Sequence, residues 1–410
     1  MLCRTFLRGS LSRPFSTSQP NHVKVRSLAP GLAASFAILG AASAVSTSVF
    51  ASALSPVPIA VACGVVAAAL ISPQSGAVLK PGAKFASTTL LRAGIVCVGA
   101  KLSLAEIAAN AAVCLPVVVP TMAVAIGTAV LGARVLGLHR DFAVLMAAGT
   151  GICGVTAIST VGPVIGAAEQ YVAVAVANVI VFGLLGMLLY PLLAHTAFFP
   201  SNDPNNERTN SPDSRVDPSP SSTLSAGTKA GLFLGVSIHD SSQVLGAAMS
   251  FRDVYNNEEA FNVAAITKLT RNLLLVAAVP LLAILHRRMG GTATTSAQSA
   301  AKMPPLFPSF VLGFLGMAAL RSLGDYLTAH SNVSADACTA WNTTHKFVGD
   351  TVGSKLLLGT AMAGLGLGTS LSVLAGVGWR PFAVGGFAAA SAACTGYLMI
   401  QLLDKCGWGR

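Results

Sequence analysis

The chain has 410 residues, of which 53% are hydrophobic and only 10% charged, and its formal net charge is +11. Soluble domains carry about 25% charged residues, so this composition excludes an ordinary soluble enzyme and indicates a polytopic membrane protein. The chain has no series of alternating ten-residue segments, Lys/Arg-rich runs or abundant aromatic residues, which argues against an outer-membrane barrel and against nucleic-acid binding.

The first 26 residues carry five basic side chains and no acidic one, and the first acidic residue of the chain is Glu106. An Arg- and Ser-rich, acid-free start is typical of a mitochondrial or plastid transit peptide. We therefore expect residues 1–26 to be a transit peptide and the protein to lie in the mitochondrial inner membrane, with the plastid envelope or the plasma membrane as alternatives. The same residues also fit a basic tail that only fixes orientation in the membrane.

Apolar stretches follow one another along the rest of the chain. A membrane-spanning helix needs about 20 mostly apolar residues, and the sequence offers roughly eleven such stretches. They fall near residues 28–50, 57–73, 83–101, 106–133, 141–167, 169–198, 226–250, 262–286, 306–327, 347–373 and 379–403. The pattern predicts an all-α membrane protein.

One polar, Pro- and Ser-rich segment, 201–224, interrupts the apolar pattern, and its composition is typical of a disordered linker. It divides the chain into a first transmembrane half, 27–200, and a second, 225–405. Each half is long enough for several spans.

Two pairs of segments resemble each other within the chain: residues 90–104 resemble 357–371, and 149–158 resemble 235–244. Inverted repeats in transporters leave weak traces of this kind, whereas Gly- and Ala-rich spans also match by chance. We predict two inverted repeats with two broken helices near the membrane midplane.

The segment GVSIHDSSQV, 235–244, places polar groups inside an apolar stretch, including Ser237, His239, Asp240 and Gln243. An ionisable side chain inside a span is unfavourable by at least a few kcal/mol, so it marks a functional site. A continuous lipid-facing helix would not tolerate this cluster, whereas a broken helix that lines a polar cavity would. Asp240 is a candidate carrier of a coupling proton or a structural counter-ion.

The segment GTGICGVTAI, 149–158, is the predicted partner break, because glycines alternate there with Thr150 and Thr156. Broken helix ends expose backbone N–H groups and a positive dipole, which suit an anion. The alternative is that the glycines, Gly154 among them, only permit close packing of helices.

Three further polar side chains, Lys268, Arg271 and Asn272, share one face of an apolar helix. They would neutralise Asp240 or attract an anionic substrate, unless they only reach towards the membrane surface. Arg92 is a further cation within an apolar stretch.

The chain lacks HExxH, GxSxG, P-loop and GxGxxG motifs, and its eight cysteines form no CxxC pair. We therefore expect no enzyme activity, no cofactor and no metal site.

Five segments, in order, resemble the YeiH-type family of bacterial membrane proteins, whose members are often labelled sulfate exporters. The segments are PGAKFASTTLLRAGIVCVGAKLSL (81–104), AAGTGICGVTAISTVGPVIGA (147–167), GVSIHDSSQVLGAAMSF (235–251), ITKLTRNLLL (266–275) and GLGTSL (366–371) with GWRPF (378–382). That family is distantly similar to the cation:proton antiporter and bile-acid symporter superfamily, which implies inverted repeats, crossing broken helices and a mobile core. Residue by residue, the resemblance points to Thr150, Ile152, Cys153 and Gly154, to Ser237, His239, Asp240 and Gln243, and to Lys268, Arg271 and Asn272.

The resemblance and the buried charges together predict a secondary transporter that exports or exchanges a small, sulfate-like anion by alternating access. A coupling proton or sodium ion and the lipid bilayer are the expected partners, nucleic acid is not, and the sequence leaves a homodimer open. A passive anion channel and a membrane scaffold without transport activity are the alternatives.

Overall fold

The computed structural model describes residues 25–48, 55–199, 224–290, 309–330, 335–369 and 378–407. Within these ranges the chain is all-helical and contains no strand, which confirms the predicted all-α class. Six helices are long and apolar enough to cross a membrane, and the pair α11–α12, bent by 47°, makes up to seven. The count of eleven spans and the two inverted repeats stay predictions. Most of the polar segment 201–224 lies outside the described residues.

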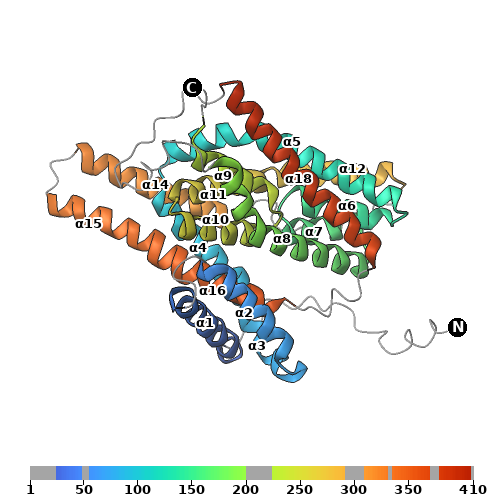
Figure 1. Ribbon diagram of the computed structural model, residues 1–410, viewed down its shortest axis with the longest axis horizontal. Coiled ribbons are helices and arrows are strands. Elements are labelled where there is room, and N and C mark those ends of the chain that lie inside the picture. The colour runs from blue at the N-terminus through green and yellow to red at the C-terminus, as the bar shows by residue number, and fades with distance from the viewer. Residues whose placement is uncertain are drawn as a thin grey trace.

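The first of two groups of helices contains both early and late parts of the chain. In Figure 1, α1, α2, α3 and α16 lie together at one side of the molecule, and α4, α14 and α15 extend from them. The bounds are α1 (Val25–Ser48), α2 (Pro56–Leu70), α3 (Pro73–Phe85), α4 (Leu91–Val98), α14 (Ser309–His330), α15 (Ala335–Lys346), η4 (Phe347–Leu358) and α16 (Gly359–Gly368). We call these helices the first group.

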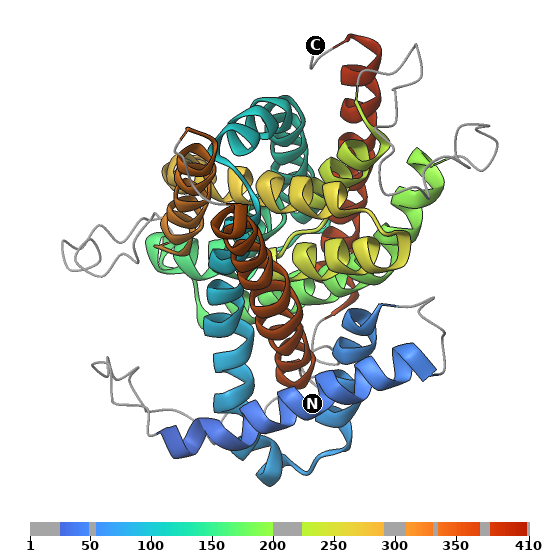
Figure 2. The same ribbon diagram turned by 90° about the vertical axis from the view of Figure 1, so that its left-hand side faces the viewer.

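The second group contains the middle of the chain and its last helix. The view in Figure 2 shows these helices stacked beside the first group, with α18 running along their edge. The bounds are α5 (Leu104–Val135), α6 (Arg140–Gly151), α7 (Val155–Ile165), α8 (Glu169–Phe198), α9 (Ala226–Ser237), α10 (Ser241–Tyr255), α11 (Glu258–Leu273), α12 (Leu275–Arg288) and α18 (Trp379–Lys405).

Helix α5 shows how local sequence sets an element boundary. The Ser103 hydroxyl accepts from the backbone N–H of Glu106, and the Glu106 carboxylate accepts from the backbone N–H of Ser103. This capping box satisfies two N–H groups that a helix start otherwise leaves unpaired. The helix therefore begins at Leu104, close to the predicted start near residue 106.

Helix α3 begins at Pro73, whereas the sequence predicted a loop up to about residue 83. Lys80 and Lys84 therefore belong to a helix, which continues through a five-residue π-helical turn, η1 (Ala86–Leu90), into α4 and the short η2 (Gly99–Lys101). The loop was predicted because Lys80, Pro81 and Gly82 interrupt the apolar run. The helix tolerates Pro81 in its interior.

Close approach between α2 and α16 ties the first group together. A Cβ added at Gly366 would lie 2.3 Å from the Val61 carbonyl oxygen, and one at Gly64 would lie 2.7 Å from the Leu367 nitrogen. Small residues of this kind let helix backbones touch where lipid supplies no hydrophobic drive for association.

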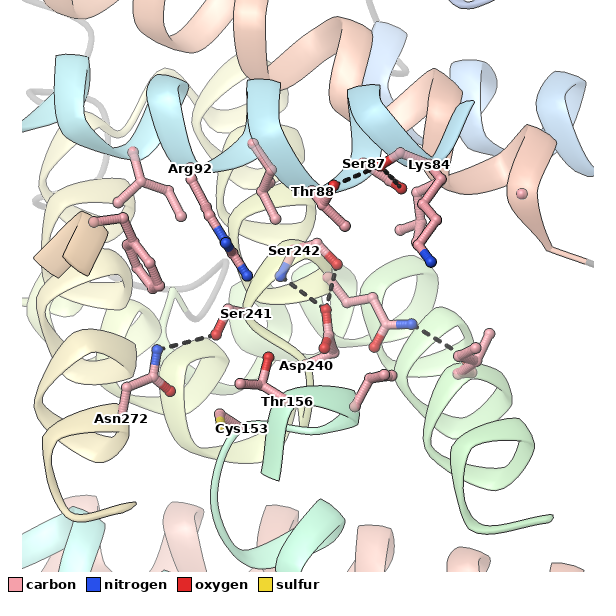
Figure 3. Close-up of a pocket in the computed structure, with 18 of the residues that line it drawn as sticks. Lys84, Ser87, Thr88, Arg92, Cys153, Thr156, Asp240, Ser241, Ser242 and Asn272 are labelled. Carbon is pink, nitrogen blue, oxygen red and sulfur yellow. Dashed lines mark hydrogen bonds between the residues drawn. The ribbon is translucent and has the colours of Figure 1, made fainter. Parts of the chain in front are cut away.

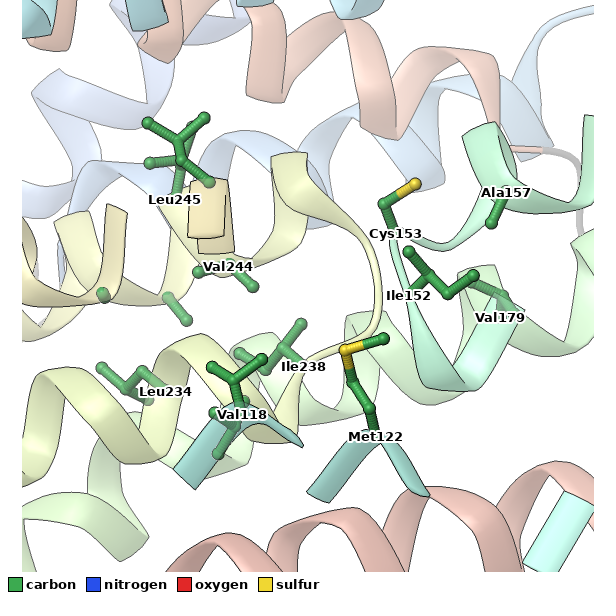
Figure 4. Close-up of a cluster of buried hydrophobic side chains, with 14 of the residues drawn as sticks. Val118, Met122, Ile152, Cys153, Ala157, Val179, Leu234, Ile238, Val244 and Leu245 are labelled. Atoms are coloured by element: carbon green, nitrogen blue, oxygen red, sulfur yellow. The ribbon is translucent and has the colours of Figure 1, made fainter. Parts of the chain in front are cut away.

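The largest hydrophobic core surrounds the two helix breaks (Figure 4). Val118 and Met122 of α5 lie beside Ile238, and Ile152 lies beside Val179 of α8. All five side chains are buried. Tight packing around irregular backbone holds the breaks in one conformation.

Candidate functional site

The first helix break separates α6, which ends at Gly151, from α7, which begins at Val155. Gly154 has φ +66° and ψ −128°, a conformation that only glycine adopts without strain. A Cβ at this position would lie 2.7 Å from the Oδ1 atom of Asp240. The first break therefore touches the second, which lies between Ser237 and Ser241.

Arg271 holds the carboxyl ends of both interrupted helices. Its Nε donates to the Gly151 carbonyl at 2.8 Å, one terminal nitrogen donates to the Val236 carbonyl at 2.8 Å, and the other donates to the Thr150 carbonyl. The side chain is fully buried. A helix end leaves carbonyl groups unpaired and carries partial negative charge, so a buried guanidinium satisfies both needs.

Lys268, one helical turn before Arg271, also binds backbone carbonyls at the two breaks. Its ammonium donates to the carbonyls of Ile152 and Ile238, each at 3.2 Å, and to the carbonyl of His239. An ammonium has three N–H donors, and here each has a backbone acceptor. Both cations therefore bind protein backbone at the place where the two breaks meet.

Asp240 occupies the amino end of α10. Its carboxylate accepts from the Ser242 backbone N–H at 3.0 Å and from the Ser242 hydroxyl. A carboxylate at this position caps the helix and interacts favourably with its positive end. Because Gly154 lies against the same carboxylate, the amino ends of α7 and α10 meet at Asp240.

A cavity of about 630 Å³ lies between the two groups of helices, above these amino ends. Polar side chains from both groups line it (Figure 3). The first group contributes Lys80, Lys84, Ser87, Thr88 and Arg92, and the second contributes Cys153, Thr156, Asp240, Ser241, Ser242, Gln243 and Asn272. Three of these side chains are cationic and one is acidic, so the lining has a formal excess of positive charge.

Lys84 and Arg92 point across the cavity towards the start of α10 (Figure 3). Among the described residues, neither side chain forms an ion pair with an acidic group. Both belong to Gln74–Lys101, one of the six helices able to cross a membrane. An unpaired charge there requires water or an anion as its partner, because hydrocarbon cannot solvate it.

The structure brings half of the predicted site residues to the cavity. These are Arg92, Cys153, Thr156, Asp240, Gln243 and Asn272. The Asn272 amide donates to the Ser241 hydroxyl at 3.1 Å, and the Gln243 amide donates to the Ile180 carbonyl at 3.0 Å. These hydrogen bonds therefore fix both side-chain amides at the edge of the cavity.

The other predicted residues lie behind the cavity lining. They are Thr150, Gly154, Ser237, His239, Lys268 and Arg271. The Thr150 hydroxyl donates to the Met146 carbonyl at 2.7 Å, and Ser237 and His239 are buried. Lys268 also borders a second, much smaller cavity next to the first. These positions shape the breaks without facing the main cavity.

Lys80, Lys84, Ser87 and Thr88 are lining residues that the sequence did not predict. A signal for them was present, because these positions together with Leu91, Arg92 and Ile95 recur at the three- and four-residue spacing of a single helix face. The predicted span begins near residue 83, which leaves Lys80 outside it and hides the continuous face.

The comparison with protein families matches one family, described as Conserved hypothetical protein 698, over residues 30–207 and 220–385. A UPF0324 membrane protein of Bordetella bronchiseptica is 33% identical over 338 residues, which cover 81% of this chain and 88% of the relative. One of Pseudomonas aeruginosa is 29% identical over 374 residues, covering 90% and 92%. A relative named UPF0324 membrane protein TauZ, of Paracoccus pantotrophus, is 30% identical over 254 residues, covering 61% and 65%. No solved structure matches the chain.

The predicted transit peptide and mitochondrial membrane are contradicted by these relatives, which are bacterial. The relatives therefore give no support for interpreting the basic residues at the start of the chain as a transit peptide. Residues 1–24 lie outside the described residues, and Val25 begins α1.

The family match covers most of the chain, and the relatives are membrane proteins. The six apolar helices agree with this assignment. The resemblance to the YeiH-type family is therefore confirmed, and the chain belongs to the Conserved hypothetical protein 698 (UPF0324) family of integral, multi-pass membrane proteins.

Proposed function

We propose that this protein is a secondary transporter that moves a small anion, with sulfate as the reference substrate, across the membrane by alternating access. One observation carries the proposal: Lys84 and Arg92 face the amino ends of two broken helices across a cavity of about 630 Å³. Unpaired cations and helix amino ends both stabilise negative charge, and here they converge on one space.

The position of the cavity supports transport over a scaffold without transport activity. It lies between two groups of helices, so a displacement of one group against the other would expose it to the opposite side. At the far end of the same helical run, roughly 25 Å from Lys84 at about 1.5 Å per residue, Lys101 contacts Glu258 of α11 and Asp350 of η4. These ion pairs join the two groups of helices at that end.

Asp240 is the group through which a proton would be coupled to the anion. Among the described residues it is the one acidic side chain in the cavity lining, and it shares the cavity with Lys84 and Arg92. Protonation of Asp240 would remove a negative charge from the anion's side of the cavity. Anion binding and proton binding would then favour each other, as symport requires.

Reconstitution into liposomes tests the proposal. Purified protein is expected to transport at least one anion from a panel that includes sulfate and sulfite, and the flux should respond to an imposed pH gradient. Arg92→Gln should reduce this flux at least tenfold. Lys346→Gln, which removes an exposed cation in α15 away from the cavity, serves as the control.

Accumulation against a concentration gradient distinguishes a coupled transporter from a passive channel. If the pH gradient drives anions uphill, the channel alternative is rejected. If no anion in the panel crosses the membrane and Arg92→Gln changes nothing, the transporter proposal is rejected in favour of a scaffold.

A further inference from the structure

The cavity has a second, apolar part to its lining. Ile95, Leu275, Phe310 and Leu365 face the same space as the cations, and they come from α4, α12, α14 and α16. Ile95 and Leu275 are almost completely buried. A site built for an inorganic anion alone gains nothing from apolar side chains, because they cannot replace its hydration shell.

The size of the cavity also exceeds what an inorganic anion needs. A tetrahedral anion occupies the space of a few water molecules, each with a share of about 30 Å³ in the liquid. The cavity measures about 630 Å³. Pockets of about 300–1,000 Å³ with mostly apolar walls and a few placed polar groups are typical of organic ligands.

We propose that the transported substrate is an organic anion with a hydrocarbon body. This inference rests on the proposed transport function and names the substrate class for the same site. The acidic head group binds between Lys84, Arg92 and the amino end of α10, and the body lies against Ile95, Leu275, Phe310 and Leu365. Sulfate has the charge of such a head group but no hydrocarbon body, so we expect it to bind weakly.

The charges favour a single acidic head group. Among the described lining residues, the three cations are offset by Asp240 alone, and the apolar side chains of Leu275, Phe310 and Leu365 come from other helices than the cations. A substrate with acids at both ends would place one of them against the apolar wall, where it would lose hydration without compensation.

Binding measurements with linear alkanesulfonates from one to six carbons, compared with sulfate, test the inference. These probes are ionised at every relevant pH and differ only in the length of the body. Purified wild-type protein in lipid nanodiscs should bind each longer member more tightly, by about fourfold per methylene group while the chain remains within the cavity. Linear alcohols of the same lengths are the control, because any binding that they show does not require an acidic head group.

Two variants distinguish the contribution of the head group to binding from that of the hydrocarbon body. Phe310→Ala should flatten the dependence on chain length, because it removes apolar surface without touching a charge. Arg92→Gln should weaken all sulfonates by a similar factor and retain the dependence on length. Leu320→Ala, on the outer face of the same helix α14 as Phe310, should behave like the wild type.

The outcomes keep the two proposals apart. Sulfate transport together with equal affinity for sulfate and hexanesulfonate overturns the organic substrate and leaves the anion transporter intact. Tight binding of the alcohols, equal to that of the sulfonates, also overturns it, because the body would then bind without the head group. Absence of binding and of transport for every anion rejects the transporter itself.

Discussion

The cations at the helix breaks and those at the cavity differ in what their nitrogens face. Lys268 and Arg271 donate to backbone carbonyls at the helix breaks, whereas Lys84 and Arg92 face an open cavity. Residue type and position in an apolar stretch are the same for both pairs. The difference lies in their surroundings. Backbone carbonyls accept hydrogen bonds from the first pair, whereas the second pair faces the cavity.

The role of Arg271 makes a stability prediction. Arg271→Met leaves the carbonyls of Thr150, Gly151 and Val236 buried without donors, at about 1–3 kcal/mol each. We expect a loss of at least about 3 kcal/mol, measured as a lower midpoint of thermal unfolding in detergent. Arg271→Lys should recover only part of it, because one ammonium cannot reach three carbonyls as a guanidinium fork does.

Arg92→Gln is the matched control, since it removes the same charge without unpairing a backbone group and should leave the unfolding midpoint unchanged. An Arg271→Met protein as stable as the wild type would show that Arg271 does not stabilise the helix breaks.

Asp240 combines a structural and a chemical role, and one substitution separates them. Asn is as good a helix cap as Asp, so the side chain in Asp240→Asn should still accept a hydrogen bond from the Ser242 backbone N–H. The unfolding midpoint of the variant should therefore equal that of the wild type. The variant cannot lose or gain the proton, so its anion flux should no longer respond to a pH gradient. Flux in liposomes at several imposed gradients measures this.

Ser242→Ala serves as the control for Asp240→Asn, because it removes a partner of the carboxylate and keeps its charge. Proton-dependent flux of wild-type size in Asp240→Asn would exclude Asp240 as the coupling group.

At the scale of elements, the two helix breaks decide the site. α6–α7 and α9–α10 are each a single apolar stretch in the sequence, interrupted over three residues in the structure. The carboxyl ends of α6 and α9 meet at Lys268 and Arg271, and the amino ends of α7 and α10 meet at Asp240 below the cavity. This arrangement directs the positive ends of both helices to the same space.

Gly154 is the residue on which this arrangement depends. Gly154→Ala would force a side chain into a conformation with positive φ and against the Asp240 carboxylate. We expect a lower unfolding midpoint and a loss of anion flux of at least tenfold. Gly127→Ala, in the open middle of α5, should be neutral or slightly stabilising, because no atom lies near its added Cβ and alanine favours helix.

Equal behaviour of these two alanine variants would show that the first break does not need the left-handed conformation at Gly154. The comparison requires that both proteins reach the membrane at the same level, which immunoblotting of isolated membranes reports.

At the scale of the whole molecule, ion pairs join the two groups of helices at the end remote from Lys84. Lys101 links α11 and η4 through Glu258 and Asp350, and the Ser55 hydroxyl donates to Asp253 at 2.9 Å. Glu258 and Asp350 are both more than a third exposed, so each pair contributes less than about 1 kcal/mol to folding. Contacts of this strength can break and reform during the alternating access that we propose.

Lys101→Met is therefore expected to change the unfolding midpoint little and to open the cavity more often at the Lys101 end. A cysteine placed at Ser241 reports this, because a membrane-impermeant thiol reagent added from the Lys101 side should label it faster in the variant. Lys346→Met is the control for loss of an exposed lysine. Unchanged labelling from that side would mean that the ion pairs do not hold the cavity closed.

The sequence by itself determined the membrane class, the family and the positions of both breaks, because these depend on local composition and on polar residues within apolar runs. His239 and Asp240 could be recognised in this way, as could the glycines near Cys153. Only the tertiary structure decided which cations face the cavity. Packing between segments far apart in the chain places Lys80, Lys84 and Arg92 in the same cavity lining as Asp240. The donors of Lys268 are occupied by carbonyls of the two breaks, and those of Arg271 by carbonyls of α6 and α9. Spacing along the chain reports which side chains share a helix face, but the acceptor that a buried charge meets is set by the helices packed against it.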